Sequence, residues 1–310
     1  MARLIEIKQK IPALYLTWII NNTCTNQCSY CPSDLHSGTN YHYEWEHALE
    51  LSEVLFSKYD KIHLAISGGE PTLSPWLKDL VKMYSDRGHP VGMTTNGART
   101  IRYYEDIAPY MSYIVLSYHP SFDDPLLLEK AKACVKTTPT CISVMMDSRH
   151  LDKALGMYNR IIEDGTVNVE PVRITDWGVG NSLGRDYTSE QERAMSNLSV
   201  VHDFKQPKPR NESLTGAIGT YDNGIKMRIN AADMIYNNET NFQGWECDIG
   251  LESLHIRYDG RIRTANCNSS DWIGKITDVP GIQWPTRSKI CPQNFCHCTT
   301  DVYVSKRRTQ

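Results

Sequence analysis

Short apolar runs recur along roughly the first half of the chain, and segments of helical character separate them. Apolar runs of about five to eight residues bounded by turn residues are typical of buried strands. They predict six strands, over residues 14–20, 62–67, 91–95, 113–117, 141–146 and 167–174. The intervening segments predict five helices, over residues 44–59, 74–87, 100–110, 125–136 and 151–163. Strands that alternate with helices predict parallel βαβ units and therefore an α/β fold.

Polar residues follow the carboxyl ends of these predicted strands. Parallel barrels bind their ligands at that edge, so we expect the functional site there. The residues are Cys24, Glu70, Asn96, Ser117, His119, Asp147 and Arg173. Asn96 before Gly97 also suits an ordinary turn, and Ser117 and His119 also suit structural roles. Asp147 and Arg173 can clamp a polar substrate, but pairing within the protein is the preferred alternative because buried charges need partners.

Three cysteines follow the first predicted strand with the spacing Cys24-x3-Cys28-x2-Cys31. Thiolates at this spacing can hold one face of a [4Fe–4S] cube and leave its fourth iron uncovered. An open metal position is typical of a reactive site. Zinc is the alternative, but a zinc site normally has a fourth ligand close by, and the nearby Asp34 and His36 fit no zinc-finger spacing.

A second motif, Gly68-Gly69-Glu70, directly follows the apolar run at residues 62–66. Glycine lets the backbone approach a ligand closely because it has no Cβ. Glu70 adds a carboxylate at the end of the predicted strand. An ordinary strand-to-helix turn is the alternative for a Gly-Gly pair alone.

Together these motifs resemble the radical S-adenosylmethionine (SAM) superfamily, in which the cysteine triplet ends in x-aromatic-Cys, as Tyr30-Cys31 does here. The resemblance implies a partial (β/α)6 barrel over residues 1–200. It also implies that the uncovered iron takes the amino and carboxylate groups of SAM, and that the Gly-Gly-Glu segment contacts the amino group. The cluster ligands would be Cys24, Cys28 and Cys31. The SAM-binding residues would be Tyr30, Gly68, Gly69, Glu70, Asn96 and Ser117.

Five of the ten cysteines lie near the C-terminus, at Cys247, Cys267, Cys291, Cys296 and Cys298. Alternation around Asp259-Gly260 predicts a β-hairpin over residues 253–263. This arrangement resembles the SPASM and twitch extensions of radical SAM enzymes, which carry auxiliary [4Fe–4S] clusters. One auxiliary cluster would take four of the five cysteines, and we expect the last three to share a site with Cys247 or Cys267. A closed four-cysteine zinc site is the alternative.

The domain organisation expected from these motifs has three parts. The radical SAM barrel covers residues 1–200, and a small cysteine-rich β-hairpin domain for the auxiliary cluster covers residues 241–310. Residues 201–240 are polar and rich in Gly and Pro up to residue 224, and we expect a linker or a lid there.

Composition narrows the class of protein further. A net charge of −3 with 22% charged residues gives no electrostatic reason to bind nucleic acid. No apolar stretch approaches the ~20 residues of a membrane span. The basic clusters at residues 205–210 and 306–308 are interpreted as a solvated loop and tail. Cysteines committed to clusters imply a reducing, cytoplasmic location, and Cys134 and Cys141 are expected to be core residues.

We therefore interpret the chain as a radical SAM enzyme with a SPASM- or twitch-like auxiliary domain. By resemblance, it reductively cleaves SAM to a 5′-deoxyadenosyl radical that abstracts hydrogen from a substrate, and the auxiliary cluster can make the net reaction an oxidation. The expected substrate is a peptide or protein, although the first predicted strand begins at residue 14 and leaves no room for an N-terminal peptide-binding domain. A small polar metabolite, such as a sugar or nucleotide derivative, is the alternative.

The expected electron donor is a reduced flavodoxin- or ferredoxin-type protein. The sequence assigns no catalytic side chain. A non-catalytic iron–sulfur electron carrier is the competing class of protein, but it would explain neither the Gly-Gly-Glu motif nor the order of strands and helices.

Overall fold

The computed structural model describes residues 2–38, 43–174, 186–267 and 269–309. The chain divides into two compact units. Unit 1 takes residues 1–19, 41–65 and 213–310, whereas unit 2 takes residues 20–40 and 66–212. Each unit is therefore assembled from segments that lie far apart in the sequence, unlike the three continuous domains expected from the motifs.

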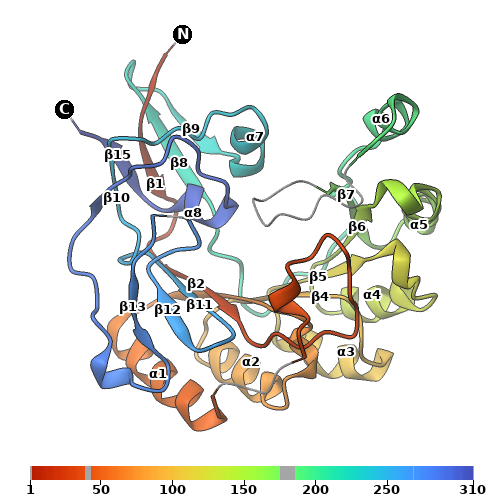
Figure 1. The fold of residues 1–310 in the computed structure, drawn as a ribbon, viewed down its shortest axis with the longest axis horizontal. Coiled ribbons are helices and arrows are strands. Elements are labelled where there is room, and N and C mark those ends of the chain that lie inside the picture. Colours follow the sequence, from red (N-terminus) through yellow and green to blue (C-terminus); the bar gives the residue numbers. More distant parts are fainter. Residues whose placement is uncertain (1, 39–42, 175–185, 268, 310) are drawn as a thin grey trace. The chain divides into compact units, whose positions relative to one another are not determined.

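Unit 2 contains four parallel strands in the order β4-β5-β6-β7, with helices on the connections between them (Figure 1). The strands are β4 (Val91–Thr95), β5 (Tyr113–Tyr118), β6 (Thr140–Met146) and β7 (Asn168–Arg173). The helices are α2 (Leu77–Asp86), α3 (Ile101–Ile107), α4 (Leu127–Val135), α5 (Leu151–Asp164) and α6 (Ser189–Ser196). Single 3₁₀ turns lie at Ser33–Leu35, Pro71–Leu73, Ala108–Tyr110, Pro120–Phe122 and Ser148–His150.

The alternation of side chains along β5 shows how unit 2 separates its core from its site. Ile114, Leu116 and Tyr118 are buried, whereas the intervening residues, Ser117 among them, are half-buried. Since successive side chains of a strand point to opposite faces, Ser117 lies on the face opposite the buried apolar row. The parallel register then places Ser117 beside Ser143 and Val115 beside Cys141. One face of β5 is thus packed, and its other face is half-buried and carries Ser117 beside Ser143 of β6.

Unit 1 contains a six-stranded sheet in the order β14-β10-β15-β1-β8-β9, and its strand pairs are antiparallel. Its strands are β1 (Leu4–Gln9), β8 (Ala217–Tyr221), β9 (Lys226–Ile229), β10 (Trp245–Cys247), β14 (Lys289–Ile290) and β15 (Lys306–Arg308).

A second group of strands in unit 1 has the order β13-β12-β11-β2, in which β11 runs parallel to β2. Its strands are β2 (Leu14–Ile19), β11 (Ser253–Ile256), β12 (Arg261–Arg263) and β13 (Trp272–Lys275). Unit 1 also holds α1 (Trp45–Lys58), α7 (Ala231–Tyr236), α8 (Thr299–Tyr303) and a 3₁₀ turn at Val279–Gly281, and β3 (Ile62–Ser67) begins in it and ends in unit 2.

The structure confirms the α/β class and the parallel strands, and strand pairing closes no barrel among the described residues. The six predicted strands and five predicted helices all occur within three residues of their expected ends. The hairpin over residues 253–263 occurs as β11 and β12. Residues 201–240, expected to be a linker or lid, contain β8, β9 and α7.

Two expectations about the chain ends are wrong. The first strand is β1 (Leu4–Gln9) rather than the run at residue 14, and it pairs with β15 at the other end of the chain (Figure 1). The basic segment at residues 306–308 is this β15 rather than a solvated tail, and Lys306 is only 2% exposed. Strands whose partners lie about 300 residues away leave no local signal. No helix of the described chain has the length and apolar character needed to cross a bilayer.

The Lys306 ammonium closes the end of α8 from within unit 1. Its Nζ donates to the carbonyl oxygens of Asp301 at 2.9 Å, Val302 at 2.8 Å and Val304 at 2.6 Å. The last carbonyls of a helix have no partner within it, so this side chain supplies one. The ammonium also lies 4.8 Å from the centre of the Phe242 ring.

Lys306→Met should therefore unfold the C-terminal strands of unit 1 locally. Methionine keeps the length but leaves buried carbonyls unpaired, and we expect a loss of about 3 kcal/mol. Amides of β15 and β10 should then exchange hydrogen roughly a hundredfold faster. Lys226→Met, on the exposed side of β9, is the matched control and should change exchange little. Equal exchange in the two variants would contradict this role for Lys306.

Candidate functional site

A cavity of about 160 Å³ lies at the carboxyl ends of the strands, within unit 2. Its walls come from the loop after β2, here called the cysteine loop (residues 21–36), and from the ends of β3, β4 and β5. The lining residues are Cys24, Asn26, Cys28, Cys31, Ser67, Gly68, Gly69, Thr94, Thr95, Asn96, Ser117 and His119. Seven of the nine residues predicted to bind the cluster or SAM thus line one cavity, and the other two, Tyr30 and Glu70, are not among its lining residues.

The glycines of the Gly-Gly-Glu motif hold the cysteine loop against β3. Gly69 N donates to Asn21 O at 3.0 Å, and Glu70 N donates to Thr23 O at 2.7 Å. A Cβ on Gly69 would lie 2.4 Å from both Thr23 O and Leu35 O. The glycine is therefore required by the backbone of the loop, in addition to any ligand.

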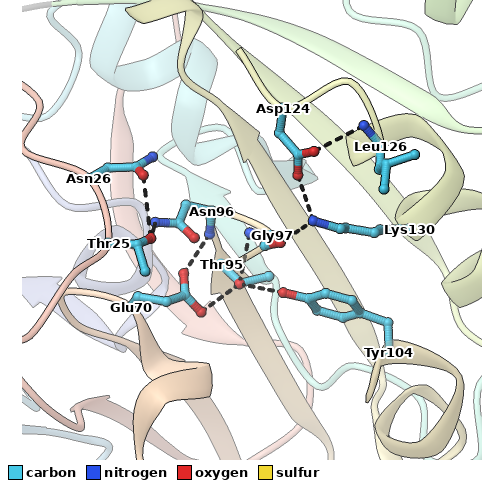
Figure 2. Close-up of polar contacts among 10 residues, drawn as sticks. All are labelled: Thr25, Asn26, Glu70, Thr95, Asn96, Gly97, Tyr104, Asp124, Leu126 and Lys130. Carbon is cyan, nitrogen blue, oxygen red and sulfur yellow. Dashed lines mark hydrogen bonds and ion pairs between the residues drawn. The ribbon is translucent and has the colours of Figure 1, made fainter. Parts of the chain in front are cut away.

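The Glu70 carboxylate is fully buried and accepts four hydrogen bonds from the protein. Oε1 accepts from Thr72 N at 3.0 Å, Thr72 Oγ1 at 2.6 Å and Thr95 Oγ1 at 2.7 Å. Oε2 accepts from Asn96 N at 2.7 Å (Figure 2). Hydrogen bonds to a charged acceptor are strong, so this carboxylate fixes the end of β4 relative to the end of β3. A direct contact between Glu70 and an ammonium group stays a prediction.

The same network continues outward to the helices that follow the strands (Figure 2). Thr95 Oγ1 accepts from Gly97 N at 3.1 Å and lies 3.0 Å from Tyr104 Oη. Gly97 O accepts from Lys130 Nζ at 2.6 Å, and the same ammonium pairs with Asp124 at 2.6 Å. The turn after β4 is thus held on both sides by side chains of α3 and α4.

Asn96 joins this network to the first cysteine. Its Nδ2 donates to Thr25 Oγ1 at 3.0 Å and lies 3.4 Å from Cys24 Sγ. Its Oδ1 is buried and has no hydrogen-bond partner among the described residues. A buried acceptor without a partner costs free energy. A ligand with a hydrogen-bond donor at this position would therefore be stabilised by Asn96 Oδ1.

Two further contacts tie the cysteine loop to β5 and β6. Tyr30 Oη lies 2.7 Å from His119 Nδ1, and the two rings stack. Burial lowers the pKa of His119 to about 4, so this imidazole is neutral at pH 7. Arg149 Nη2 donates to Ser29 Oγ at 2.6 Å and pairs with the fully buried Asp147 at 2.6 Å. Burial opposes ionisation of Asp147, but its hydrogen bonds to Arg149 lower the pKa of this carboxyl below its usual value.

The preferred alternative for Asp147 and Arg173 is confirmed, since both are paired within the protein: Asp147 with Arg149, and Arg173 with Glu192. Sequence reasoning missed Arg149, Thr72 and Thr95 as parts of the site. Arg149 follows Asp147 by two residues in a 3₁₀ turn, which brings its backbone N within 3.0 Å of the carboxylate. An Asp-x-Arg segment directly after a strand was the available signal.

The thiols of the cavity are protonated unless a cation replaces their protons. Burial raises the pKa of Cys28 to about 11 and that of Cys31 to about 12. No three cysteine sulfurs of the described chain lie within 4.8 Å of one another. Thiolates on one tetrahedral zinc ion lie about 3.8 Å apart, since each Zn–S bond is about 2.3 Å. The thiols of the triplet, as placed, are therefore not gathered around the position of a single ion.

A second cysteine cavity lies within unit 1. Four of the five C-terminal cysteines line it: Cys247, Cys267, Cys291 and Cys296. Cys298 is outside this lining and is the N-cap residue of α8. Burial raises the pKa of Cys247 to about 11 and also raises that of Cys267. The cavity brings together both hairpin-flanking cysteines and two of the last three.

Residues 18–138 match the model of the radical SAM superfamily. Among solved structures, the chain is similar to anSMEcpe with bound AdoMet and Cp18Cys peptide, with a TM-score of 0.51 and 14% identity. The same enzyme with Kp18Cys peptide gives a TM-score of 0.50 and 14% identity, and either match covers 86% of this chain and 78% of that one. SuiB of Streptococcus suis bound to S-adenosylmethionine gives 0.49 at 14% identity, over 86% of this chain and 64% of that one. No curated protein matches the chain.

Glu70→Gln should weaken the end of β4 even when no ligand is present. Each carboxylate oxygen faces a backbone N–H, of Thr72 or of Asn96, so an amide NH2 in either position meets a donor. We expect the local free energy of opening to fall by about 2–3 kcal/mol, and the Asn96 amide to exchange roughly 30- to 150-fold faster. Glu163→Gln on the exposed side of α5 is the control. Unchanged exchange at Asn96 would show that the carboxylate does not hold this turn.

Proposed function

Because residues 18–138 of this enzyme belong to the radical SAM superfamily, whose cofactors are a [4Fe–4S] cluster and SAM, we propose that Cys24, Cys28 and Cys31 ligate that cluster. The observation that carries the proposal is the single cavity that the three thiols line at the strand ends. Three thiolates also leave one iron uncovered.

When bound, the cluster supplies the electron that cleaves SAM to methionine and a 5′-deoxyadenosyl radical, which abstracts hydrogen from the substrate. The chain's own residues bind SAM and orient it. Gly68, Gly69 and Asn96 line the cavity beside the cysteines, and the unpartnered Asn96 Oδ1 can accept a hydrogen bond from the SAM ammonium. Ser117 and the neutral His119 line the β5 side and can contact the rest of SAM. Tyr30 positions His119, and Glu70 positions Asn96.

An auxiliary [4Fe–4S] cluster held by Cys247, Cys267, Cys291 and Cys296 is the second part of the proposal. These four line one cavity in unit 1, and Cys298 is the thiol left over. The proposed ligand set therefore contains both cysteines that flank the hairpin, Cys247 and Cys267. The sequence spacing alone favoured a site made of Cys291, Cys296 and Cys298 with only one of these two. Such a cluster can accept the electron left on a substrate radical, which would make the net reaction an oxidation.

The substrate that we propose is a peptide or protein. Support comes from the solved neighbour anSMEcpe, which was determined with a bound peptide.

The electron donor that we propose is a reduced flavodoxin- or ferredoxin-type protein. We also propose a cytoplasmic location, because none of the ten cysteines forms a disulfide and cysteines that ligate clusters suit a reducing compartment.

Changing Cys24, Cys28 and Cys31 together to Ala should abolish SAM cleavage. Anaerobically reconstituted and reduced wild-type protein should form 5′-deoxyadenosine and methionine, measured by chromatography. Cys134→Ala is the control, since Cys134 is buried in α4 away from the cavity. Formation of 5′-deoxyadenosine at the wild-type rate by the triple variant would rule out the assignment.

Iron counting should separate the C-terminal ligands from the spare thiol. Wild-type protein should hold about eight irons, four per cube. Cys298→Ala should keep them, whereas Cys247→Ala with Cys296→Ala should leave about four. If Cys298→Ala loses iron as the double variant does, the ligand set is wrong. Four irons in the wild-type protein would mean that the auxiliary cluster does not exist.

A further inference from the structure

Cys141, Glu170 and His202 lie together in unit 2, and none of them lines the SAM cavity. Cys141 is the second residue of β6, near the opposite end of the strand from Asp147. The sequence suggested a core cysteine, but this side chain is only half-buried. His202 is exposed, and Glu170 is half-buried. The expectation of a core position for Cys141 is therefore wrong, because this residue lies near the start of β6 and beside the edge strand β7.

Strand register explains how the three residues meet. In the parallel pair of β6 and β7, Cys141 is opposite Asn168 and Ser143 is opposite Glu170. Residues two apart on a strand share a face, so Cys141 and Glu170 lie on the same side. Residue 201 forms an isolated bridge with Val169, through hydrogen bonds of 3.0 and 2.9 Å, which brings His202 to this edge.

The distances suit one metal ion. The ligand atoms of the three side chains all lie within 4.8 Å of one another, and Cys141 Sγ is 4.0 Å from His202 Nε2. Zinc binds a thiolate at about 2.3 Å and an imidazole at about 2.0–2.1 Å, so on one tetrahedral ion the two atoms lie about 3.6 Å apart. One ion can therefore bind both atoms once the side chains shift by a few tenths of an ångström, without movement of the backbone. This is the one group of three or more such ligands found in the described part of the chain.

The surroundings of the three ligands support a cation as well. Ser143 Oγ donates to Glu170 Oε1 and so orients the carboxylate. Asn168 Oδ1, on the same face, is buried without a hydrogen-bond partner among the described residues. It can accept a hydrogen bond from a water ligand. Thiolate, imidazole and carboxylate together suit a borderline divalent ion rather than Mg²⁺ or Ca²⁺.

We propose that Cys141, Glu170 and His202 form a mononuclear site for a divalent transition metal of the zinc class. The ion joins β6 and β7 to the segment after residue 201. That segment also contacts β6 through Gln206, whose Oε1 accepts from Thr140 N at 2.9 Å. The site thus fastens residues 201–206 to the outer strands of unit 2, independently of the two iron–sulfur sites.

X-ray absorption at the zinc edge tests the proposal on the holoenzyme, because iron does not interfere there. Reconstituted protein is given one equivalent of zinc chloride, desalted and measured. We expect one zinc per chain with one sulfur at about 2.3 Å and two or three nitrogen or oxygen neighbours at about 2.0–2.1 Å. His202→Ala and Cys141→Ala should each lose this zinc. The control His47→Ala, in α1, should keep it.

Hydrogen exchange provides a second readout that does not depend on activity. Zinc should slow exchange of the Val201 amide, which donates to Val169 O, in the wild-type protein but not in His202→Ala. Two results would overturn the proposal. One is failure of the wild-type protein to retain zinc after desalting. The other is a zinc with three or four sulfur neighbours that His202→Ala leaves unchanged, since this would place the ion among the C-terminal cysteines.

Discussion

The site of unit 2 depends on one buried carboxylate. Glu70 lies at the end of β3, and four donors from Thr72, Thr95 and Asn96 surround it. A buried charge is stable only when it is paired or fully hydrogen-bonded, so these donors must stay in place. Gly68 and Gly69, directly before Glu70, and Thr95 and Asn96 at the end of β4 then line the cavity with the cysteines. The sequence motif read as a ligand contact is therefore also the structural anchor of the site.

The cysteine loop has little regular structure of its own, and its position comes from the strands around it. Backbone hydrogen bonds join it to β3, while Asn96, His119 and Arg149 reach it from the ends of β4, β5 and β6. Each contact uses a residue within three positions of the end of a strand. A ligand set held in this way is preorganised by the parallel strands, which explains why the three thiols share one cavity although the loop carries only a single 3₁₀ turn.

How far the sequence predicts this protein depends on how local each signal is. The six strands and five helices were predicted well because each apolar run and its bounding turns lie within about 15 residues. The pairing of β1 with β15 and β8 was not predicted, because the partner strands lie some 200 to 300 residues away. Residues that line the cavity were found where they belong to a motif. Thr95, which donates to Glu70 from the next strand, and the group of Cys141, Glu170 and His202 were missed, because they meet only through the pairing of separate segments.

We propose that the cysteine loop holds a cluster with one iron open to SAM. Electron–nuclear double resonance can detect this geometry on the reduced protein, with SAM isotopically labelled at its amino and carboxylate groups. We expect hyperfine coupling between the cluster and both labels, and the same coupling in protein that lacks the C-terminal cysteines. Bound SAM with no coupling to either label would contradict it.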